Sequence, residues 1–369
     1  MIQKISSFQA ILLVMSSIIP TAILTVPSIV VQASGQDAWI SIALATAIGI
    51  GVAYMTGQIC RQTPSSSVSF VDWLSLRLGT WAGTGTGFLL GYYYFITALI
   101  IIREFVNFLA ENVLTRTPVF ALLLVTIAVA MYAVSCGIEV IARINIIVFM
   151  MSIVVLFITT ILVLKDIHPE FLLPVWEHPI STIVQGGFIP SSWLSEVSVL
   201  LILAPFLNRS AEAGRIGSWG IILTGFELGL IVVSAVTLFG PRLVSLMSYP
   251  TFNVISIIRL GSFLERIDIL FISIWICLMY VKISIFMFCA LHCFIRTFRV
   301  RNEKPFSFAL ALFALLSTYY FWPRSSDFIH FTMYPLTPFI LTFNVLLPLL
   351  IWLALSLFKP KAMEGGKLP

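Results

Sequence analysis

The chain has 369 residues, of which 59% are hydrophobic and only 10% are charged. So few charged residues cannot cover the surface of a soluble globule, and we therefore expect an integral membrane protein. The net charge is +5, but the basic residues do not form a run interleaved with exposed aromatic residues, so the sequence excludes a nucleic-acid-binding module.

Ten apolar runs follow one another along the chain. Each is close to the roughly 20 residues that cross the hydrocarbon core of a bilayer as an α-helix. We predict an all-α integral membrane domain over residues 1–369, with transmembrane spans at 8–32, 38–60, 84–108, 119–136, 144–164, 183–207, 217–239, 268–294, 306–322 and 336–358.

The basic residues predict the orientation of these spans. With a cytoplasmic N-terminus, most of the Lys and Arg residues fall in cytoplasmic loops or ends, and the densest cluster is Arg296, Arg299, Arg301 and Lys304. Short cytoplasmic loops of membrane proteins carry an excess of Lys and Arg. Both termini are therefore predicted to be cytoplasmic, with residues 359–369 as a cytoplasmic tail.

The first span, FQAILLVMSSIIPTAILTVPSIVV, has Pro20 near its middle. Proline has no N–H to donate to the carbonyl of Ser16, so we expect the helix to be interrupted there. Thr21 and Ala22 follow directly and would lie beside the interruption. A structural proline kink is the alternative interpretation.

The second and third spans carry small residues at four-residue spacing, which lets helix backbones approach closely in a membrane. These residues are Ala45, Gly49, Ala53 and Gly57, followed by Gly79, Gly83, Gly87 and Gly91. The third span continues with an aromatic run. In it Tyr92 and Ile96, one turn apart, share a helix face that we predict to line a pocket.

The sixth span contains GGFIPSSWLSEVS, residues 186–198, with a second set of helix breakers at Gly186, Gly187 and Pro190. Transporters built from two inverted five-helix repeats have discontinuous helices at matching places, and their freed backbone groups bind substrate near the bilayer midplane. The first and sixth of ten spans are such places. We therefore predict repeats at 8–164 and 183–358, with a binding site between the two interruptions.

Three ionisable residues lie well inside predicted spans: Glu196, Glu227 and Lys282. A charge at the centre of a membrane helix costs roughly 2.5–3.5 kcal/mol, so each needs a partner, a wet cavity or neutralisation. Glu196 and Lys282 either line the pocket or fasten the fold, and both readings stay open. For Glu227 we expect a structural role.

Cysteine and histidine residues show no metal-ligand spacing, and no nucleophile motif or phosphate-binding loop is present. We therefore expect no enzymatic activity, no cofactor and no metal. The pocket that we predict for a ligand is formed by residues from four spans: Pro20, Thr21, Ala22, Tyr92, Ile96, Ser191, Ser192, Leu194, Glu196, Lys282 and Phe286.

Several short strings resemble the B-subunit family of spore germinant receptors, in the amino acid, polyamine and organocation transporter superfamily. They are QDAWIS (36–41), CGIEVIARIN (136–145), APFLNR (204–209), MSYP (247–250), FLERIDILF (263–271) and VKIS (281–284). Their order and spacing along nearly the whole chain make the resemblance specific. It implies a LeuT-like fold with discontinuous helices 1 and 6, in the inner membrane of a bacterial endospore.

The resemblance also implies a function. Such B-subunits recognise a small germinant, often an amino acid, and act with a membrane A-subunit and a lipoprotein C-subunit. The family's Gly-Thr-Gly segment falls on Pro20, Thr21 and Ala22, so only the threonine is kept. The family's acidic residue falls on Glu196 and its lysine on Lys282, where a fixed ammonium could take the place of a sodium ion that this architecture often binds.

These features lead us to expect a germinant-sensing subunit that signals to its partner subunits. An active amino-acid or cation symporter is the alternative, because composition, topology and helix interruptions fit it equally well. A purely structural membrane scaffold for the partner subunits is a third possibility.

Overall fold

The structure, a computed structural model, describes residues 4–63, 68–257, 267–322, 327–328, 331–332 and 335–357. Within these ranges the chain is helical apart from connecting turns and one isolated β-bridge, between Ile5 and Leu207. Eight of the described helical runs are long and apolar enough to cross a membrane. The prediction of an all-α membrane protein is thus confirmed, while the predicted tail 359–369 lies outside the described residues.

Helices occupy the described residues of the intervals predicted as spans, apart from Leu207 and Trp322 at two of the ends. The helix over the interval 306–322 is not among the eight runs that are long and apolar enough to cross a membrane. In the first half the helices are α1 (Ser7–Ser34), α2 (Ala38–Gln62), α4 (Thr80–Phe108), α5 (Val119–Cys136) and α6 (Ile138–Val163). The shorter elements of this half are the 3₁₀ turn η1 (Gly35–Asp37), the helix α3 (Phe70–Leu78), the π segment η2 (Leu109–Val113) and the 3₁₀ turns η3 (Leu164–Asp166) and η4 (Pro169–Leu172).

In the second half the sixth span is composite. It is built from α7 (Ile180–Leu194), the 3₁₀ segment η5 (Ser195–Val199), α8 (Leu200–Leu203) and the 3₁₀ turn η6 (Ala204–Phe206). The later elements are η7 (Ser210–Glu212), α9 (Ala213–Phe239), α10 (Pro241–Val244), α11 (Pro250–Ser256), α12 (Ile267–Phe298), α13 (Glu303–Phe321), α15 (Leu336–Leu341), the π segment η8 (Thr342–Leu346) and α16 (Leu347–Leu357). The division into two five-helix repeats stays a prediction.

The chain reverses between α1 and α2. Gly35 adopts a φ of +52°, which L side chains rarely adopt. The Ser41 hydroxyl donates to the Ser34 hydroxyl at 3.0 Å, whereas residues seven apart in one straight helix are separated by about 10 Å along the axis. The continuous helical run Ser7–Gln62 therefore supplies two of the predicted spans.

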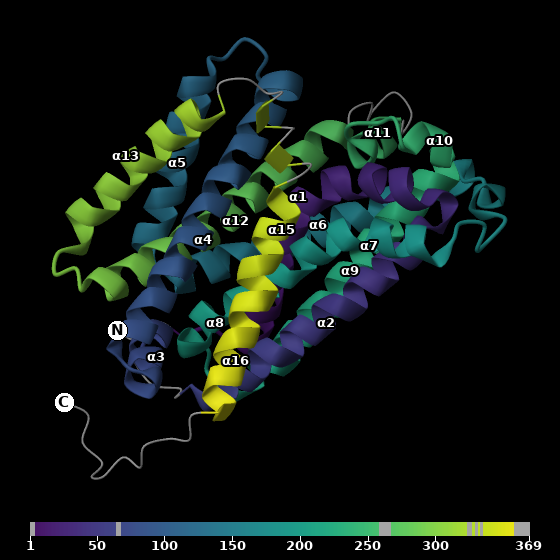
Figure 1. Cartoon of the computed structure of the whole chain (residues 1–369). Helices are drawn as coiled ribbons and strands as arrows, with labels where there is room; N and C mark the ends of the chain where they lie inside the picture. Colours follow the sequence, from purple (N-terminus) through teal and green to yellow (C-terminus); the bar gives the residue numbers. More distant parts are fainter. Residues whose placement is uncertain are drawn as a thin grey trace.

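Glycines on α2 and α9 allow these two helices to pack backbone against backbone. A Cβ added to Gly57 would collide with the Cα of Gly214, and one added to Gly49 would press on Ile221 and Leu194. Figure 1 shows α2 and α9 side by side at one edge of the bundle, with α5 and α13 at the other. The close packing predicted from the small-residue spacing is confirmed for α2 and for Gly83, Gly87 and Gly91 of α4, but a Cβ on Gly79 would meet nothing within 4 Å.

A pair of glycine substitutions on α2 tests this packing. We expect Gly57→Ala to lower the melting temperature in detergent, because the added methyl group forces α2 and α9 apart. Gly51→Ala is the matched control, because Gly51 is exposed and its added Cβ meets nothing within 4 Å. We expect this control to melt at or slightly above the wild-type temperature, and equal melting of the two variants would contradict the packing.

The first span is not interrupted at Pro20, contrary to the prediction. α1 continues through both Pro20 and Pro27, and at Pro27 a neighbouring helix compensates for the lost helical hydrogen bond. Pro27 frees the carbonyl of Ile23, and the Thr251 hydroxyl of α11 donates to it. The helix is therefore continuous, and in its C-terminal half it depends on a tertiary partner for the carbonyl that Pro27 frees.

The sixth span is discontinuous as predicted, but at another place. Gly186, Gly187 and Pro190 all lie inside α7, and the departure from α-helical geometry comes later, in η5. The two glycines instead allow close packing, since a Cβ on Gly186 would meet the hydroxyls of Ser34 and Ser41. The prediction of helix breaks at these residues was wrong, because α7 continues through all three and the glycines serve close packing against α1 and α2.

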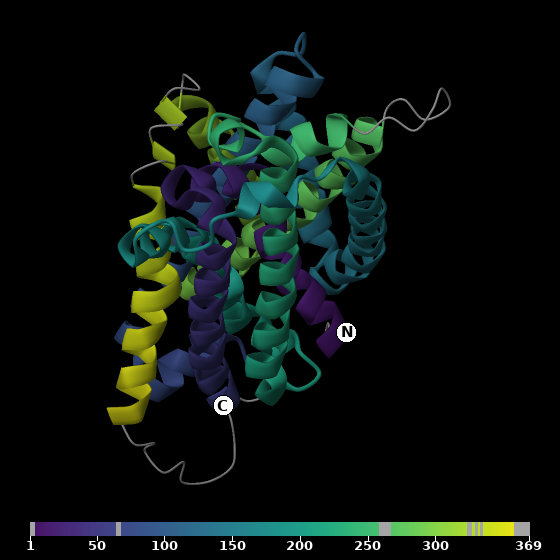
Figure 2. The same ribbon diagram turned by 90° about the vertical axis from the view of Figure 1, so that its right-hand side faces the viewer.

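The interior of the bundle is formed by α1, the sixth span and α12. Every residue from 194 to 205 is buried, and most of α1 is buried as well. The backbone of Ile5 pairs with Phe206 and Asn208, which joins the start of α1 to the end of the sixth span. Figure 2 shows the α15–α16 helix along one edge of the bundle, where it packs against α2 and α7.

Candidate functional site

A buried cluster of charged and polar side chains joins α1, η5 and α12. The ammonium Nζ of Lys282 lies 2.6 Å from Thr21 Oγ1 and 3.0 Å from Glu196 Oε2. Lys282 is 0% exposed and Glu196 only 3%. Three residues that the sequence singled out, from three different spans, thus meet at one point.

The 3₁₀ segment η5 places Glu196 in this cluster. Serines precede it, and their hydroxyls donate to backbone carbonyls three residues earlier: Ser192 to Ile189 at 2.7 Å and Ser195 to Ser192 at 2.5 Å. Such local bonds compete with the regular helical pattern. A 3₁₀ segment has three residues per turn, so Glu196 and Ser198 point in different directions from one short stretch of chain.

α12 holds α1 at two levels. Trp275 and Lys282, seven residues apart, lie on one face of α12. The indole Nε1 of Trp275 donates to the Pro20 carbonyl at 2.7 Å, and Lys282 donates to the adjacent Thr21. The middle of α1 is therefore fastened to α12 through consecutive residues, and a movement of either helix would disturb both contacts.

The ion pair between Lys282 and Glu196 is the electrostatic centre of the cluster. Each charge alone would lose several kcal/mol of solvation on burial, and the opposite charge compensates for that loss. The ring of Phe286, one turn along α12, lies 5.6 Å from the ammonium and adds a cation–π contact. The pair is thus neutral as a whole, but each member depends on the other.

A second polar chain lies on the other side of η5. The Ser198 hydroxyl donates to Asn344 Oδ1 at 2.5 Å, and Asn344 Nδ2 donates to the Tyr93 hydroxyl at 2.7 Å. It joins η5 to the π segment η8 and to α4. The sequence analysis missed Tyr93, Ser198 and Asn344, although an asparagine inside an apolar span is a signal that could have found the last of them.

Other residues of the predicted pocket lie elsewhere. Tyr92 is 42% exposed and packs against Phe339 and Phe343 on the outside of the bundle. Ile96, on the same face of α4, is half-buried. Leu194 is buried against Gly49 of α2. Tyr92 therefore lies outside the cluster, because the inward face of α4 is one residue away from it. For Ile96 and Leu194 the predicted place in a ligand pocket stays a prediction.

The remaining predicted residues are buried near the cluster without offering free polar groups. Pro20 and Ala22 flank Thr21 on α1 and are buried. The hydroxyls of Ser191 and Ser192 donate to carbonyls of their own helix α7. The cluster therefore keeps Thr21, Glu196, Lys282 and Phe286 from the predicted set.

A matched pair of tyrosine variants tests the second polar chain. We expect Tyr93→Phe to destabilise the protein by about 1–3 kcal/mol, because Asn344 Nδ2 would lose its buried acceptor. Tyr92→Phe should change stability by less than about 0.5 kcal/mol, because its ring lies at the surface. Thermal unfolding of both purified variants measures the difference, and a reversed order would contradict this assignment.

The family model described as "Spore germination protein" matches residues 4–329 of the chain. "Spore germination protein KB" of Bacillus subtilis (strain 168) is 25% identical over 339 residues, covering 90% of each chain. "Putative spore germination protein YfkT" of the same strain is 27% identical over 343 residues, covering 92% of each chain.

Solved transporters show the same fold. The crystal structure of MhsT in complex with L-phenylalanine superposes with a TM-score of 0.66 at 16% identity, covering 96% of this chain and 89% of that one. A closed conformation of Mhp1, a nucleobase-cation-symport-1 family transporter with bromovinylhydantoin bound, gives a TM-score of 0.59 at 12% identity, covering 94% and 79%. The predicted LeuT-like fold is thereby confirmed.

Proposed function

Because the chain belongs to the spore germination protein family, we propose that it is the germinant-sensing subunit of a spore germination receptor. It binds a small germinant, an amino acid, in a transporter-like site and signals to partner subunits. The observation that carries the proposal is the buried contact of Lys282 with Glu196 and Thr21, at the meeting point of α1, η5 and α12.

The chemistry of this cluster favours a zwitterionic ligand. An amino acid carries one carboxylate and one ammonium, which can pair with Lys282 and Glu196 respectively and so replace their mutual ion pair. One buried ion pair is exchanged for two, and both Lys282 and Glu196 keep an opposite charge as partner. The desolvation cost of binding in a dry site therefore stays low. The complex of MhsT with L-phenylalanine, a protein of the same fold, supports this class of ligand.

We infer the route of signalling from the helices that a bound ligand would separate. A ligand shifts a conformational equilibrium only if it binds one state more tightly than the other. Opening of the Lys282–Glu196 pair releases α12 from η5 and changes the contact of Lys282 with Thr21 on α1. We propose that this movement is transmitted to an A-subunit and a lipoprotein C-subunit, in the inner membrane of the endospore and with both termini cytoplasmic.

An active amino-acid or cation symporter is the second candidate function. The fold is shared with a sodium-coupled sialic acid symporter, with a TM-score of 0.57 at 13% identity. We propose instead that the Lys282 ammonium, held between α1 and α12, takes the place of a bound sodium ion. Sodium-dependent binding of the germinant by the purified protein would contradict this assignment.

Deletion of the gene in its spore-former tests the proposed function. We expect spores of the deletion strain to lose germination with one compound of a panel of amino acids, sugars and nucleosides, and the intact gene to restore it. A normal response to the whole panel would overturn the sensor function. Concentrative uptake of a labelled amino acid by the protein in liposomes would favour the symporter.

A further inference from the structure

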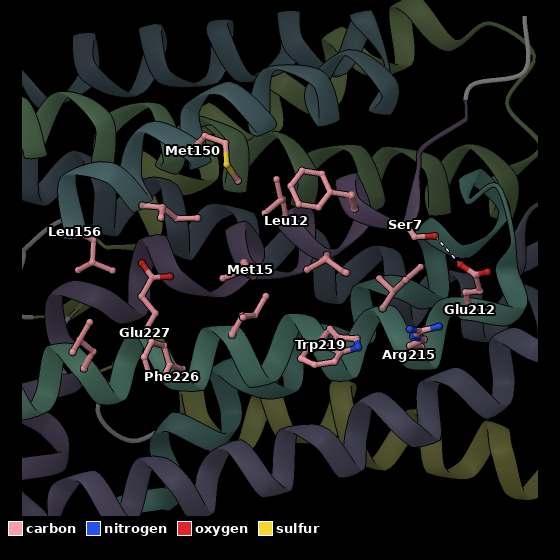
Figure 3. A pocket seen from close by; sticks show the side chains of 16 residues that line it. Ser7, Leu12, Met15, Met150, Leu156, Glu212, Arg215, Trp219, Phe226 and Glu227 are labelled. Atoms are coloured by element: carbon pink, nitrogen blue, oxygen red, sulfur yellow. Dashed lines mark hydrogen bonds between the residues drawn. The ribbon is translucent and has the colours of Figure 1, made fainter. Parts of the chain in front are cut away.

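A large cavity lies between α1, α6 and α9, on a different side of α1 from the cluster around Lys282. Its volume is about 620 Å³, within the range of ligand pockets. Its walls are almost entirely apolar, with Leu12, Met15, Leu156, Trp219, Leu223 and Phe226 among the lining side chains (Figure 3). Phe226 is 71% exposed, so the cavity opens toward the acyl chains of the surrounding lipid.

Glu227 is the polar group at the deep end of this cavity. It is only 6% exposed, and no hydrogen bond or ion pair links its carboxyl group to the described residues. Figure 3 shows the carboxyl extending from α9 toward Leu156 and Met15. Glu227 also lines a second, smaller cavity, together with Thr251 and Trp275, so its carboxyl lies where two empty spaces meet.

Glu227 lies deep in the membrane-spanning helix α9, where a carboxyl group without a partner is costly. It lies 14 residues after the start of α9 at Ala213, which is about 21 Å along the helix and therefore near the middle of the bilayer. An ionisable group at this depth is costly unless it is paired, and it marks a functional site by default. Glu196 has such a partner in Lys282, whereas Glu227 has none among the residues that the structure describes.

The other polar groups of the cavity lie at its rim, and the carboxylate among them already has hydrogen-bond and ion-pair partners. The Ser7 hydroxyl donates to Glu212 Oε2 at 2.7 Å, and Arg209 lies 3.3 Å from Glu212 Oε1. The rim with Arg215 therefore carries no unpaired negative charge. A cationic group entering the cavity finds its unpaired counter-charge only at Glu227.

We propose that this cavity binds a membrane-dissolved cationic amphiphile, whose ammonium pairs with Glu227 and whose apolar chain lies between α1, α6 and α9. The apolar walls fit the chain, the opening beside Phe226 gives access from the bilayer, and the buried carboxylate supplies the charge that selects an amine. The site is independent of the proposed function and would exist in a sensor, a symporter or a scaffold.

Thermal unfolding of the full-length protein in phosphatidylcholine nanodiscs tests the proposal, with n-octylamine as the probe and 1-octanol and octyl phosphate as matched controls. We expect a saturable rise in melting temperature with octylamine and none with either control. Equal effects of octylamine and octanol would overturn the choice of an amine. A larger effect of octyl phosphate would move the site to Arg215 at the rim and also overturn it.

Four variants locate the ammonium of the bound octylamine. We expect Glu227→Gln to weaken octylamine binding by at least about tenfold, because it removes one partner of a buried charge pair. Glu212→Gln at the rim should leave binding unchanged. Leu223→Trp fills the cavity without altering Glu227 and should abolish binding, whereas Leu312→Trp on exposed α13 should not.

The results with these variants decide whether the proposal holds. Unaltered octylamine binding in Glu227→Gln overturns the proposal, and so does loss of binding in Glu212→Gln alone. If Glu227→Gln does not fold, Leu223→Trp decides, because unaltered binding with the cavity filled would place the amine elsewhere. The ligand-free melting temperature of each variant shows whether the fold is intact.

Discussion

Lys282→Met is expected to destabilise the protein by about 3–5 kcal/mol, because it leaves the buried carboxylate of Glu196 without its cation. Methionine is unbranched and only one heavy atom shorter than lysine, so most of the packing against Phe286 is kept and the loss reports mainly the charge. The hydrogen bond to Thr21 is lost as well. Thermal unfolding of the purified protein and its level in spore membranes both measure the effect.

Lys165→Met is the matched control for this substitution. The side chain of Lys165 is 72% exposed in the loop after α6, and its nearest acidic oxygen, on Asp166, is 4.0 Å away. Exposed pairs of this kind contribute about 0–1 kcal/mol. A melting temperature for Lys282→Met equal to that of the control would show that the pair does not stabilise the bundle.

The double variant Lys282→Met/Glu196→Gln is expected to recover most of the stability lost in the single variant and still to lose the germinant response. Replacement of a buried ion pair by neutral residues of similar volume is often neutral or stabilising, because no charge remains to be desolvated. A zwitterionic germinant, however, would find neither of its counter-charges. Germination with the identified germinant and receptor level in the same spores measure the two effects separately.

This double variant separates the two roles that the charged residues could have. If the pair only fastens α12 to η5, restored stability should restore germination. If the pair contacts the germinant, stability returns and germination does not. A stable double variant with normal germination would therefore contradict ligand contact, and Glu196 and Lys282 would then serve the fold alone.

The middle of α1 and the segment η5 are held by side chains of neighbouring helices, so the site between them can be both dry and able to move. The proline-containing middle of α1 is held by side chains of α11 and α12, and η5 is held by α12 on one side and by η8 on the other. These contacts are few and specific. Their exchange for ligand contacts is a physical means by which occupancy of the site could reach the surface of the bundle.

The sequence by itself was sufficient to predict the membrane class, the positions of the long helices and the close packing of α2. These features follow from local properties, because hydropathy along about 20 residues decides whether a helix can cross a bilayer and small residues at four-residue spacing decide how near a neighbour can come. The sequence also pointed to Glu196 and Lys282, because ionisable groups at such depth need a partner, and to Thr21, because it follows Pro20 and matches the threonine of the family segment.

Only the tertiary structure decided which of these groups meet. Lys282 lies 86 residues from Glu196 and 261 from Thr21 in the chain, and no local pattern links such distant positions. A helix turns by 100° per residue, so choosing Tyr92 instead of Tyr93 selected the opposite environment. A proline alone does not fix a break for the same reason: α1 runs through Pro20 and Pro27, and the Thr251 hydroxyl of α11 gives the Ile23 carbonyl the hydrogen bond that Pro27 removes.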